Sequence, residues 1–431
     1  MSGINTWRMR RLAKEGGWIV LGQSLLILGF LVGIRILTEI MPPAAYGELS
    51  LGMTIATLVN QMILGPLGGG ITRFYAPAVE QGDLSGYLSA SRKLTLYATG
   101  IVILITLFAI VGLKIAGQST WIRITVIAFL FAIVSGVNSI LGGIQSAARQ
   151  RAIVALHLGA DPWLRSLVAA GLLLWLGTTS TVAMLGYAIA TVLLLASQAY
   201  FFLKLVVAPA NIENENKWKV DIWKFTWPIG VFGIFTWTQL ISDRWALQLF
   251  STTQEVGNYA VLYQLGFYPI SLLTGMTMQF LTPILYQRAG DARDSGRNAD
   301  VTDLCWKLTW LSLGVTLVGF LVTLILHDFI FRVFVNVNYR LVSYLLPWMI
   351  LAGGIYASGQ SLASNLLAKL KTREMMAAKI VTALFGLVFN FIGAYWLGIT
   401  GIICAGVLFS VMYFLWMVVL VNDGSVEKCL C

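Results

Sequence analysis

The sequence is poor in charge, and this shortage excludes most soluble proteins. Charged residues make up 11% of the chain and hydrophobic residues 58%, whereas a typical soluble domain has about 25% charged residues. Such a composition is typical of a polytopic membrane protein. We find no soluble stretch long enough for a separate catalytic or nucleic-acid-binding domain, so we expect no nucleic-acid partner.

The sequence also has few residues that bind metals or carry out catalysis. The two histidines, His157 and His327, are too far apart for a metal site. The cysteines show no metal-ligand spacing and none lies in a predicted external loop, which makes a disulfide framework unexpected; they are Cys305, Cys404, Cys429 and Cys431. We find no nucleophile constellation, phosphate-binding loop or dinucleotide fingerprint. The sequence therefore predicts no enzyme, no cofactor and no metal.

Long apolar runs dominate the sequence. A membrane-spanning helix needs about 20 mainly apolar residues, and the charges, glycines and prolines between the runs mark their ends. We predict an all-α polytopic membrane protein with twelve spans, at residues 17–38, 46–69, 94–116, 121–145, 152–177, 182–203, 225–250, 259–281, 308–327, 341–368, 377–397 and 400–421.

The basic residues predict the orientation of these spans. Of the 29 lysines and arginines, the great majority fall on one side of the predicted membrane. The other side receives only Lys114, Arg123, Arg332 and Arg340. Because basic loops stay in the cytoplasm, we predict that both termini and the central linker are cytoplasmic. The net charge of +10 is then mostly a consequence of topology.

A polar linker divides the spans six and six. We predict an N-terminal lobe at residues 1–204, a cytoplasmic linker at 205–224 and a C-terminal lobe at 225–431. Since six is an even number, a duplicated second half would have the same orientation as the first.

Short matches indicate an internal repeat of about 210 residues. Gly47 and Gly257 follow the first spans of the two halves at this separation, and Arg35 and Arg244 match within one residue of it. Each match is weak, but their order and shared topology favour a duplication.

Uncharged polar side chains are unevenly distributed among the spans. They occur in the first, second, fourth, seventh, eighth and tenth spans, whereas the third, ninth, eleventh and twelfth are nearly all aliphatic and aromatic. We predict that the first group lines a central cavity and the second faces lipid. Any one of these residues could instead join two helices. The substrate-binding candidates are Asn60, Gln61, Asn138, Gln239, Gln264, Tyr356 and Gln360.

Charges inside the spans are the sharpest signal, because each costs about 2.5–3.5 kcal/mol at the centre of a span. Asp161 and Arg165 lie four residues apart on one helical face. Arg165 lies about 20 Å from the cytoplasmic end of its span, where it either faces the substrate path or is only neutralised by Asp161. Arg35 and Arg244 lie nearer the external end, where snorkelling to the headgroups is an alternative.

The seventh predicted span contains two adjacent charged residues, Asp243 and Arg244. Neighbouring side chains on a helix point about 100° apart, so we expect each to pair across helices, for example Asp243 with Arg35. The three arginines are further substrate-binding candidates. Asp161 and Asp243 are candidates for ion coupling or charge pairing.

Several stretches resemble the bacterial polysaccharide-export flippases. The first half has MPPAAYGELSL and ITRFYAPAVEQGDLSGYL, and the second has SDRWALQLFSTTQEVGNYAVLYQL. These flippases belong to the multidrug/oligosaccharidyl-lipid/polysaccharide (MOP) exporter superfamily. The motifs are short, so they identify the family better than the substrate.

The resemblance implies two six-helix lobes around a cationic cavity in a bacterial cytoplasmic (inner) membrane. The cargo would be an undecaprenyl-diphosphate-linked oligosaccharide, such as an O-antigen unit of lipopolysaccharide, flipped to the outer leaflet by alternating access. A proton or sodium gradient is one option for coupling. The lipid bilayer, a polysaccharide polymerase and chain-length proteins would be its partners.

Two alternatives remain open from the sequence. A multidrug or small-molecule antiporter of the same superfamily would be expected to present acidic residues to cationic drugs, whereas the deep charges here are mostly arginine. A membrane polysaccharide polymerase or ligase usually has a large external loop, and the longest one predicted here is HDFIFRVFVNVNYR.

Overall fold

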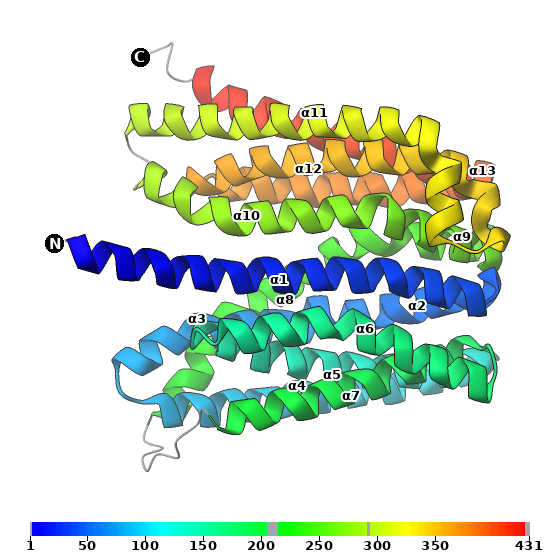
Figure 1. Ribbon diagram of the computed structural model, residues 1–431, viewed down its shortest axis with the longest axis horizontal. Helices are drawn as coiled ribbons and strands as arrows, with labels where there is room; N and C mark the ends of the chain where they lie inside the picture. Colours follow the sequence, from blue (N-terminus) through cyan, green and yellow to red (C-terminus); the bar gives the residue numbers. More distant parts are fainter. Residues whose placement is uncertain (1, 205–213, 291–293, 427–431) are drawn as a thin grey trace. The chain divides into compact units, whose positions relative to one another are not determined.

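The computed structural model describes residues 2–204, 214–290 and 294–426. Every regular element in these ranges is a helix (Figure 1), which confirms the predicted all-α class. The first part of the predicted linker, 205–213, lies outside the described residues, as do Cys429 and Cys431.

The chain divides into two compact units, Met1–Trp237 and Thr238–Cys431, called unit 1 and unit 2 below. The division falls inside helix α8 (Glu215–Phe250), which begins within the predicted linker. The lobe limits at residues 204 and 225 stay a prediction. Unit 1 contains α1 (Ser2–Ile40), α2 (Pro43–Val59), the π-helix η1 (Asn60–Leu64), α3 (Gly65–Glu80), α4 (Leu84–Ile115), α5 (Thr120–Ala147), α6 (Arg151–Leu176), α7 (Ser180–Leu203) and the first part of α8.

Unit 2 contains the rest of α8, α9 (Thr253–Leu265), α10 (Phe267–Ala289), α11 (Ser295–Phe334), the 3-10 helix η2 (Val337–Leu345), α12 (Leu346–Ala368) and α13 (Thr372–Val426). Gly398 interrupts α13 with a φ of 55°, a conformation that glycine adopts without strain. The backbone N–H of Ile399 donates to Glu255 Oε2 at 3.1 Å. The eleventh and twelfth predicted spans are therefore two helices joined at this bend.

Eight helical segments of the described chain are long and apolar enough to cross a membrane: Gly16–Ile40, Pro43–Glu80, Leu84–Ile115, Thr120–Ala147, Ser180–Leu203, Ser295–Phe334, Val337–Ala368 and Arg373–Asn422. The last is 50 residues long and holds two of the predicted spans. The remaining three predicted spans fall on α6, α8 and α9–α10. Two of these helices, α6 and α8, carry the deep ion pairs, and charge lowers their mean hydropathy.

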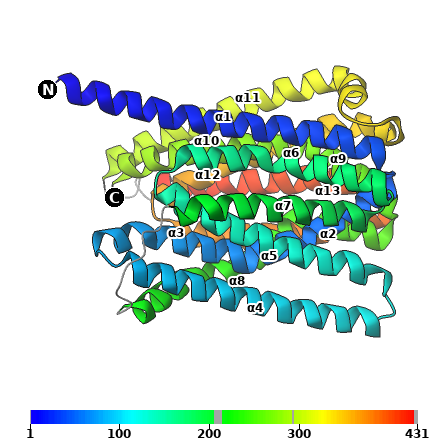
Figure 2. The same ribbon diagram turned by 60° about the horizontal axis from the view of Figure 1, so that its bottom comes forward.

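Helix packing within each unit follows similar rules. In unit 1, α3 and α4 pack on α5, and α5 packs on α7 (Figure 2). In unit 2, α10 and α11 pack on α12, which packs on α13. The second, third and fourth predicted spans of one half and the eighth, ninth and tenth of the other therefore pack in the same order. The duplication itself stays a prediction.

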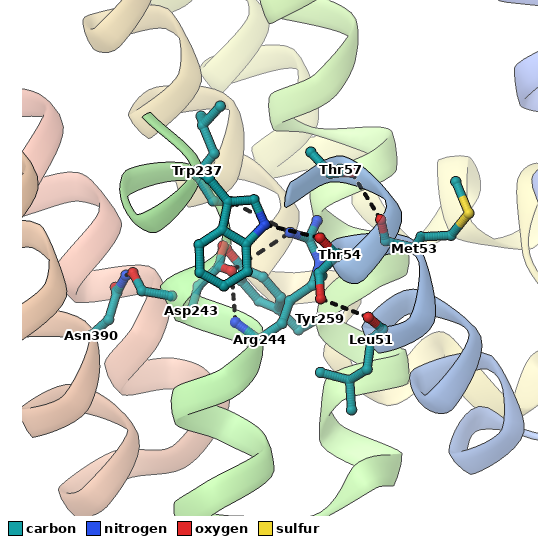
Figure 3. A network of polar contacts seen from close by, with 11 residues as sticks. Leu51, Met53, Thr54, Thr57, Trp237, Asp243, Arg244, Tyr259 and Asn390 are labelled. Atoms are coloured by element: carbon teal, nitrogen blue, oxygen red, sulfur yellow. Dashed lines mark hydrogen bonds and ion pairs between the residues drawn. The ribbon is translucent and has the colours of Figure 1, made fainter. Parts of the chain in front are cut away.

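The first part of α8 packs along α2 and α3 within unit 1. The indole N–H of Trp237 donates to the carbonyl of Thr54 at 2.9 Å (Figure 3). One turn earlier in α8, the Cα of Gly233 lies so close to η1 that a Cβ there would be 2.2 Å from the carbonyl oxygen of Gln61. Near its start, Trp218 donates to Asp83 Oδ2 at 2.8 Å.

A cluster of charged residues outside the predicted span holds the beginning of α8 against α4. Glu215 pairs with Lys93 at 2.7 Å and with Lys219 at 2.5 Å, and it accepts a 2.6 Å hydrogen bond from Ser89. Hydrogen bonds from Lys219, Lys93 and Ser89 lower the pKa of the Glu215 carboxyl from 4.5 to about 2. This cluster joins α8 to α4.

Candidate functional site

Unit 2 has a small cavity at the junction of α8, α9, α12 and α13, lined by apolar side chains with several polar groups among them. Its polar and aromatic lining includes Gln239, Asp243, Tyr259, Tyr263, Tyr356 and Asn390. The cavity has a volume of about 50 Å³, and one water needs about 10–15 Å³ measured in this way. A few waters or a small ion therefore fit, but a sugar does not.

Asp243, which Figure 3 shows next to Arg244 and Tyr259, is one of the residues that line this cavity. Its Oδ2 accepts a hydrogen bond from the Tyr259 hydroxyl at 2.5 Å, and its Oδ1 accepts the backbone N–H of Arg244 at 2.6 Å. The Arg244 guanidinium lies 3.6 Å from the same Oδ1. The expectation that these adjacent residues do not pair was wrong, because the long arginine side chain turns back toward the carboxylate.

Arg244 is buried among aromatic rings of unit 2. It is 7% exposed, and its Cζ lies 4.4 Å from the ring centre of Tyr263 and 5.9 Å from that of Tyr259. Its Nη1 also lies 3.4 Å from the carbonyl oxygen of Leu240. A guanidinium over a tyrosine face is stabilised by cation–π attraction. Substrate binding by Arg244 stays a prediction, and these contacts favour a role in holding Asp243.

Amide and hydroxyl groups complete the cavity wall. Gln239 Nε2 donates to the Tyr356 hydroxyl at 3.3 Å, and Asn390 Nδ2 donates to Ser242 Oγ at 2.8 Å. Ser410, from the second part of α13, also lines the cavity. The seventh, eighth and tenth predicted spans therefore contribute to this small cavity of unit 2. The central cavity predicted for six spans stays a prediction.

The prediction that the eleventh and twelfth spans face only lipid was wrong. Asn390 and Ser410 place both of them at the cavity. The signal was present in the sequence, since Asn390 is an amide inside an otherwise apolar run. Tyr259 was also missed, because a tyrosine in an apolar run does not stand out until its hydroxyl is seen to reach a carboxylate.

Unit 1 has a second deep ion pair, on α6. Arg165 Nη2 lies 2.8 Å from Asp161 Oδ2, and the two side chains are 22% and 25% exposed. The Arg165 guanidinium also covers the ring of Phe131 on α5 at 4.8 Å. Within the described residues, Arg165 Nε and Asp161 Oδ1 have no hydrogen-bond partner. The predicted one-face pairing is therefore present, and each group keeps unused hydrogen-bonding capacity.

Arg35 makes a more exposed pair with its neighbour on α1. Its Nη2 lies 2.9 Å from Glu39 Oε2, and the side chains are 40% and 52% exposed. Asp243 has its partners Tyr259 and Arg244 within unit 2. The suggested pairing of Asp243 with Arg35 is thus not needed to neutralise either charge.

The remaining candidates in unit 1 lie around the π-helix η1. Asn60 Nδ2 donates to the carbonyl of Ala56 at 3.1 Å and to Ser135 Oγ at 3.2 Å. Gln61 is exposed, and the carbonyl oxygen of its backbone is the group that approaches α8. Asn138 is half-buried, and its Oδ1 has no hydrogen-bond partner among the described residues. Single turns of π-helix often occur at functional sites.

Two candidates of unit 2 lie outside the cavity lining. Gln264 is half-buried on α9. Gln360 on α12 is also half-buried, and its Oε1 lies 3.5 Å from Lys379 Nζ on α13. Binding of substrate by these residues, as by the rest of the set, stays a prediction.

Comparison with known proteins now identifies the family. Residues 12–289 match the sequence profile described as "Polysaccharide biosynthesis protein", which is more than half of the chain. The chain belongs to this family. A search among curated proteins finds no match.

Solved structures show that this member of the family has the fold of MOP superfamily transporters. The lipid II flippase MurJ in an inward closed conformation has a TM-score of 0.71 at 14% identity, covering 94% of this chain and 87% of MurJ. An inward-facing multidrug resistance MATE transporter has a TM-score of 0.64 at 13% identity, covering 94% and 98%. A variant of the Vibrio cholerae MATE transporter VcmN has a TM-score of 0.62 at 15% identity, covering 97% of both chains. The chain is therefore a multi-pass membrane protein with a transporter fold.

Proposed function

We propose that this protein is a flippase for a lipid-linked oligosaccharide, with an undecaprenyl diphosphate carrier and a sugar unit of a surface polysaccharide as cargo. It would act in the cytoplasmic membrane of a bacterium, by alternating access of its two units. The membership in the polysaccharide biosynthesis family and the fold shared with a lipid II flippase support this proposal.

The pairing of the deep carboxylates with arginines favours a flippase over a multidrug exporter. Asp161 is neutralised by Arg165 at 2.8 Å, and Asp243 lies 3.6 Å from Arg244. A cationic drug needs an unpaired buried carboxylate, because a charge taken out of water must be compensated. Both of these carboxylates already have a cation, so a neutral or anionic cargo fits better. Arginine is also well suited to bind phosphate with two parallel hydrogen bonds.

Among the arginines, Arg165 is our choice for the diphosphate. Its side chain is 22% exposed, whereas Arg244 is 7% exposed and lies against Tyr263. We infer that a phosphate oxygen binds the exposed part of the Arg165 side chain while the pair with Asp161 is kept. Arg35 remains a second candidate, with an exposed guanidinium.

Coupling to an ion gradient fits the cavity of unit 2. The space of about 50 Å³ admits water or a small cation beside Asp243, Tyr259 and Asn390. A carboxylate can take up a proton without displacing its paired cation. We infer that a proton taken up by Asp243 would neutralise the carboxylate, weaken its attraction to Arg244 and so couple the proton to the packing of α8.

The decisive experiment measures lipid translocation by the purified full-length protein in proteoliposomes. A fluorescent undecaprenyl-diphosphate disaccharide is placed in both leaflets, and a membrane-impermeant quencher reports its movement. We expect rapid loss of protected fluorescence with the protein and slow loss in empty liposomes. Ethidium accumulation is measured in parallel. Transport of ethidium without movement of the glycolipid would refute the proposal and favour a multidrug exporter.

A further inference from the structure

One lysine of unit 2 has no role in the site described above. Lys379 lies on α13, seven residues after its first residue Thr372, which is about 10 Å along the helix. Within the described residues its one hydrogen bond goes to Gln360 Oε1 at 3.5 Å, and no carboxylate pairs with it. Lys307 on α11 differs, because it pairs with Asp303 at 2.6 Å.

The direction of the Lys379 side chain argues against a snorkelling anchor. Snorkelling lysines extend toward the membrane surface, which for this helix is the predicted cytoplasmic turn between α12 and α13. Gln360 lies eight residues before Ala368, the last residue of α12, about 12 Å away from that turn. The ammonium group therefore lies beside α12 at about the depth of its own backbone, and it does not extend toward that turn.

Lys379 stands at one end of a row of polar groups. Tyr356 lies four residues before Gln360 on α12, so the two share a helical face, and Tyr356 accepts a hydrogen bond from Gln239 at 3.3 Å. Gln239 and Tyr356 line the small cavity, so this row runs from the cavity to Lys379. Gln360 and Lys379 are both half-buried, and part of each side chain is therefore exposed.

We propose that Lys379 binds an anionic group of the cargo at the predicted cytoplasmic end of unit 2, next to Gln360 and Tyr356. This inference rests on the proposed flippase function. The anion is a phosphate of the polyprenyl diphosphate or a carboxylate of an acidic sugar, since an ammonium on a flexible stem binds either as a point charge. The site would be separate from Arg165, which lies in unit 1.

The test is a binding measurement on the full-length protein in lipid nanodiscs, with two probes. One is undecaprenyl diphosphate, and the other is an oligogalacturonate, which carries carboxylates but no lipid. Lys379→Gln and Lys379→Met remove the charge at similar length, and Lys379→Arg keeps it. Lys307→Gln is the matched control, because that lysine is on the surface of the same unit and 72% exposed. Thermal unfolding of each variant verifies that it is folded.

We expect both neutral variants to bind undecaprenyl diphosphate about tenfold or more weakly, as loss of a charge-assisted hydrogen bond requires, while Lys379→Arg and Lys307→Gln bind like the wild type. Weakening confined to oligogalacturonate would assign the same site to the glycan. If the neutral variants bind both probes like the wild type, the role of Lys379 is refuted and the flippase function stands. If the wild type binds neither probe and moves no glycolipid, the proposed function fails and this inference falls with it.

Discussion

The ion pair of Asp243 and Arg244 offers the sharpest test of how unit 2 is held together. Substituting Arg244 by methionine removes the cation and keeps most of the side-chain volume. Asp243 would remain 7% exposed, with hydrogen bonds from Tyr259 and from the backbone N–H of residue 244, but with no counter-charge at 3.6 Å. The guanidinium would also leave the face of Tyr263.

The expected loss can be worked out from this geometry. Two unit charges 3.6 Å apart attract each other by roughly 4–5 kcal/mol at an effective dielectric constant of 20. Removing one partner of a buried pair typically costs about 3–5 kcal/mol. Because two hydrogen bonds still satisfy Asp243, we expect Arg244→Met to cost about 3 kcal/mol. For a unit of this size that corresponds to a fall in Tm of roughly 6–12 °C.

Thermal unfolding of the detergent-purified protein, followed by tryptophan fluorescence, measures this fall. The double variant Asp243→Asn/Arg244→Met should lose less than the sum of the two single losses, by about 1–3 kcal/mol, because the charges compensate each other. Asp303→Asn is the control, since its pair with Lys307 is 65% and 72% exposed and such surface pairs contribute about 0–1 kcal/mol.

Two results would refute this reasoning. If Arg244→Met unfolds within about 1 °C of the wild type, the buried pair does not stabilise unit 2. If the two single losses add up in the double variant, Asp243 and Arg244 act independently despite their distance. A normal Tm together with loss of glycolipid transport would instead support direct substrate binding by Arg244.

Three further predictions test other parts of the chain. Gly233→Ala should lower the stability of unit 1 by about 1–3 kcal/mol, because its Cβ would lie 2.2 Å from a backbone carbonyl oxygen. The control Gly69→Ala should be neutral or slightly stabilising, because Gly69 has open space around it. Equal Tm values for the two variants would contradict the close packing of α8. Glu215→Gln should lower the Tm near neutral pH. Since the pKa of Glu215 falls from 4.5 to about 2 in the folded protein, the difference in Tm between wild type and variant should hold above pH 4.5 and shrink between pH 4.5 and 2. A difference in Tm that is constant over that range would exclude the carboxylate as its source. Arg165→Ala should abolish surface polysaccharide at normal protein level in the membrane, with Arg165→Lys retaining part of the activity, and glycan display that survives Arg165→Ala at native expression would dismiss the role of Arg165.

Much of the architecture follows from hydrophobic length and charge. Apolar runs of about 20 residues can only be helices when they cross lipid, and so the all-α class and the positions of the helices were predictable. The pair of Asp161 and Arg165 was predictable as well, because residues four apart share a helical face. The positions of most polar residues in unit 2 followed from the same reasoning.

Contacts between helices were not predictable in this way. Nothing in the sequence placed Asn390 beside Ser242, or Tyr259 on Asp243, because these contacts join residues far apart in the chain or depend on how a helix is rotated. The pairing of Asp243 with Arg244 depends on the torsions of a long side chain, which helical spacing does not describe. The contact of Lys379 with Gln360 was likewise hidden, since a lysine near the end of a span is expected to snorkel.

Composition and spacing therefore established that this chain is a polytopic helical membrane protein with deep charges in both halves. The packed structure established which of these charges are already neutralised, that the first part of α8 packs with unit 1, and that both parts of α13 reach the small cavity of unit 2. The physical reason is that burial in lipid constrains every span separately through its own hydrophobicity, whereas a buried charge or amide is satisfied only by partners that packing brings from other helices.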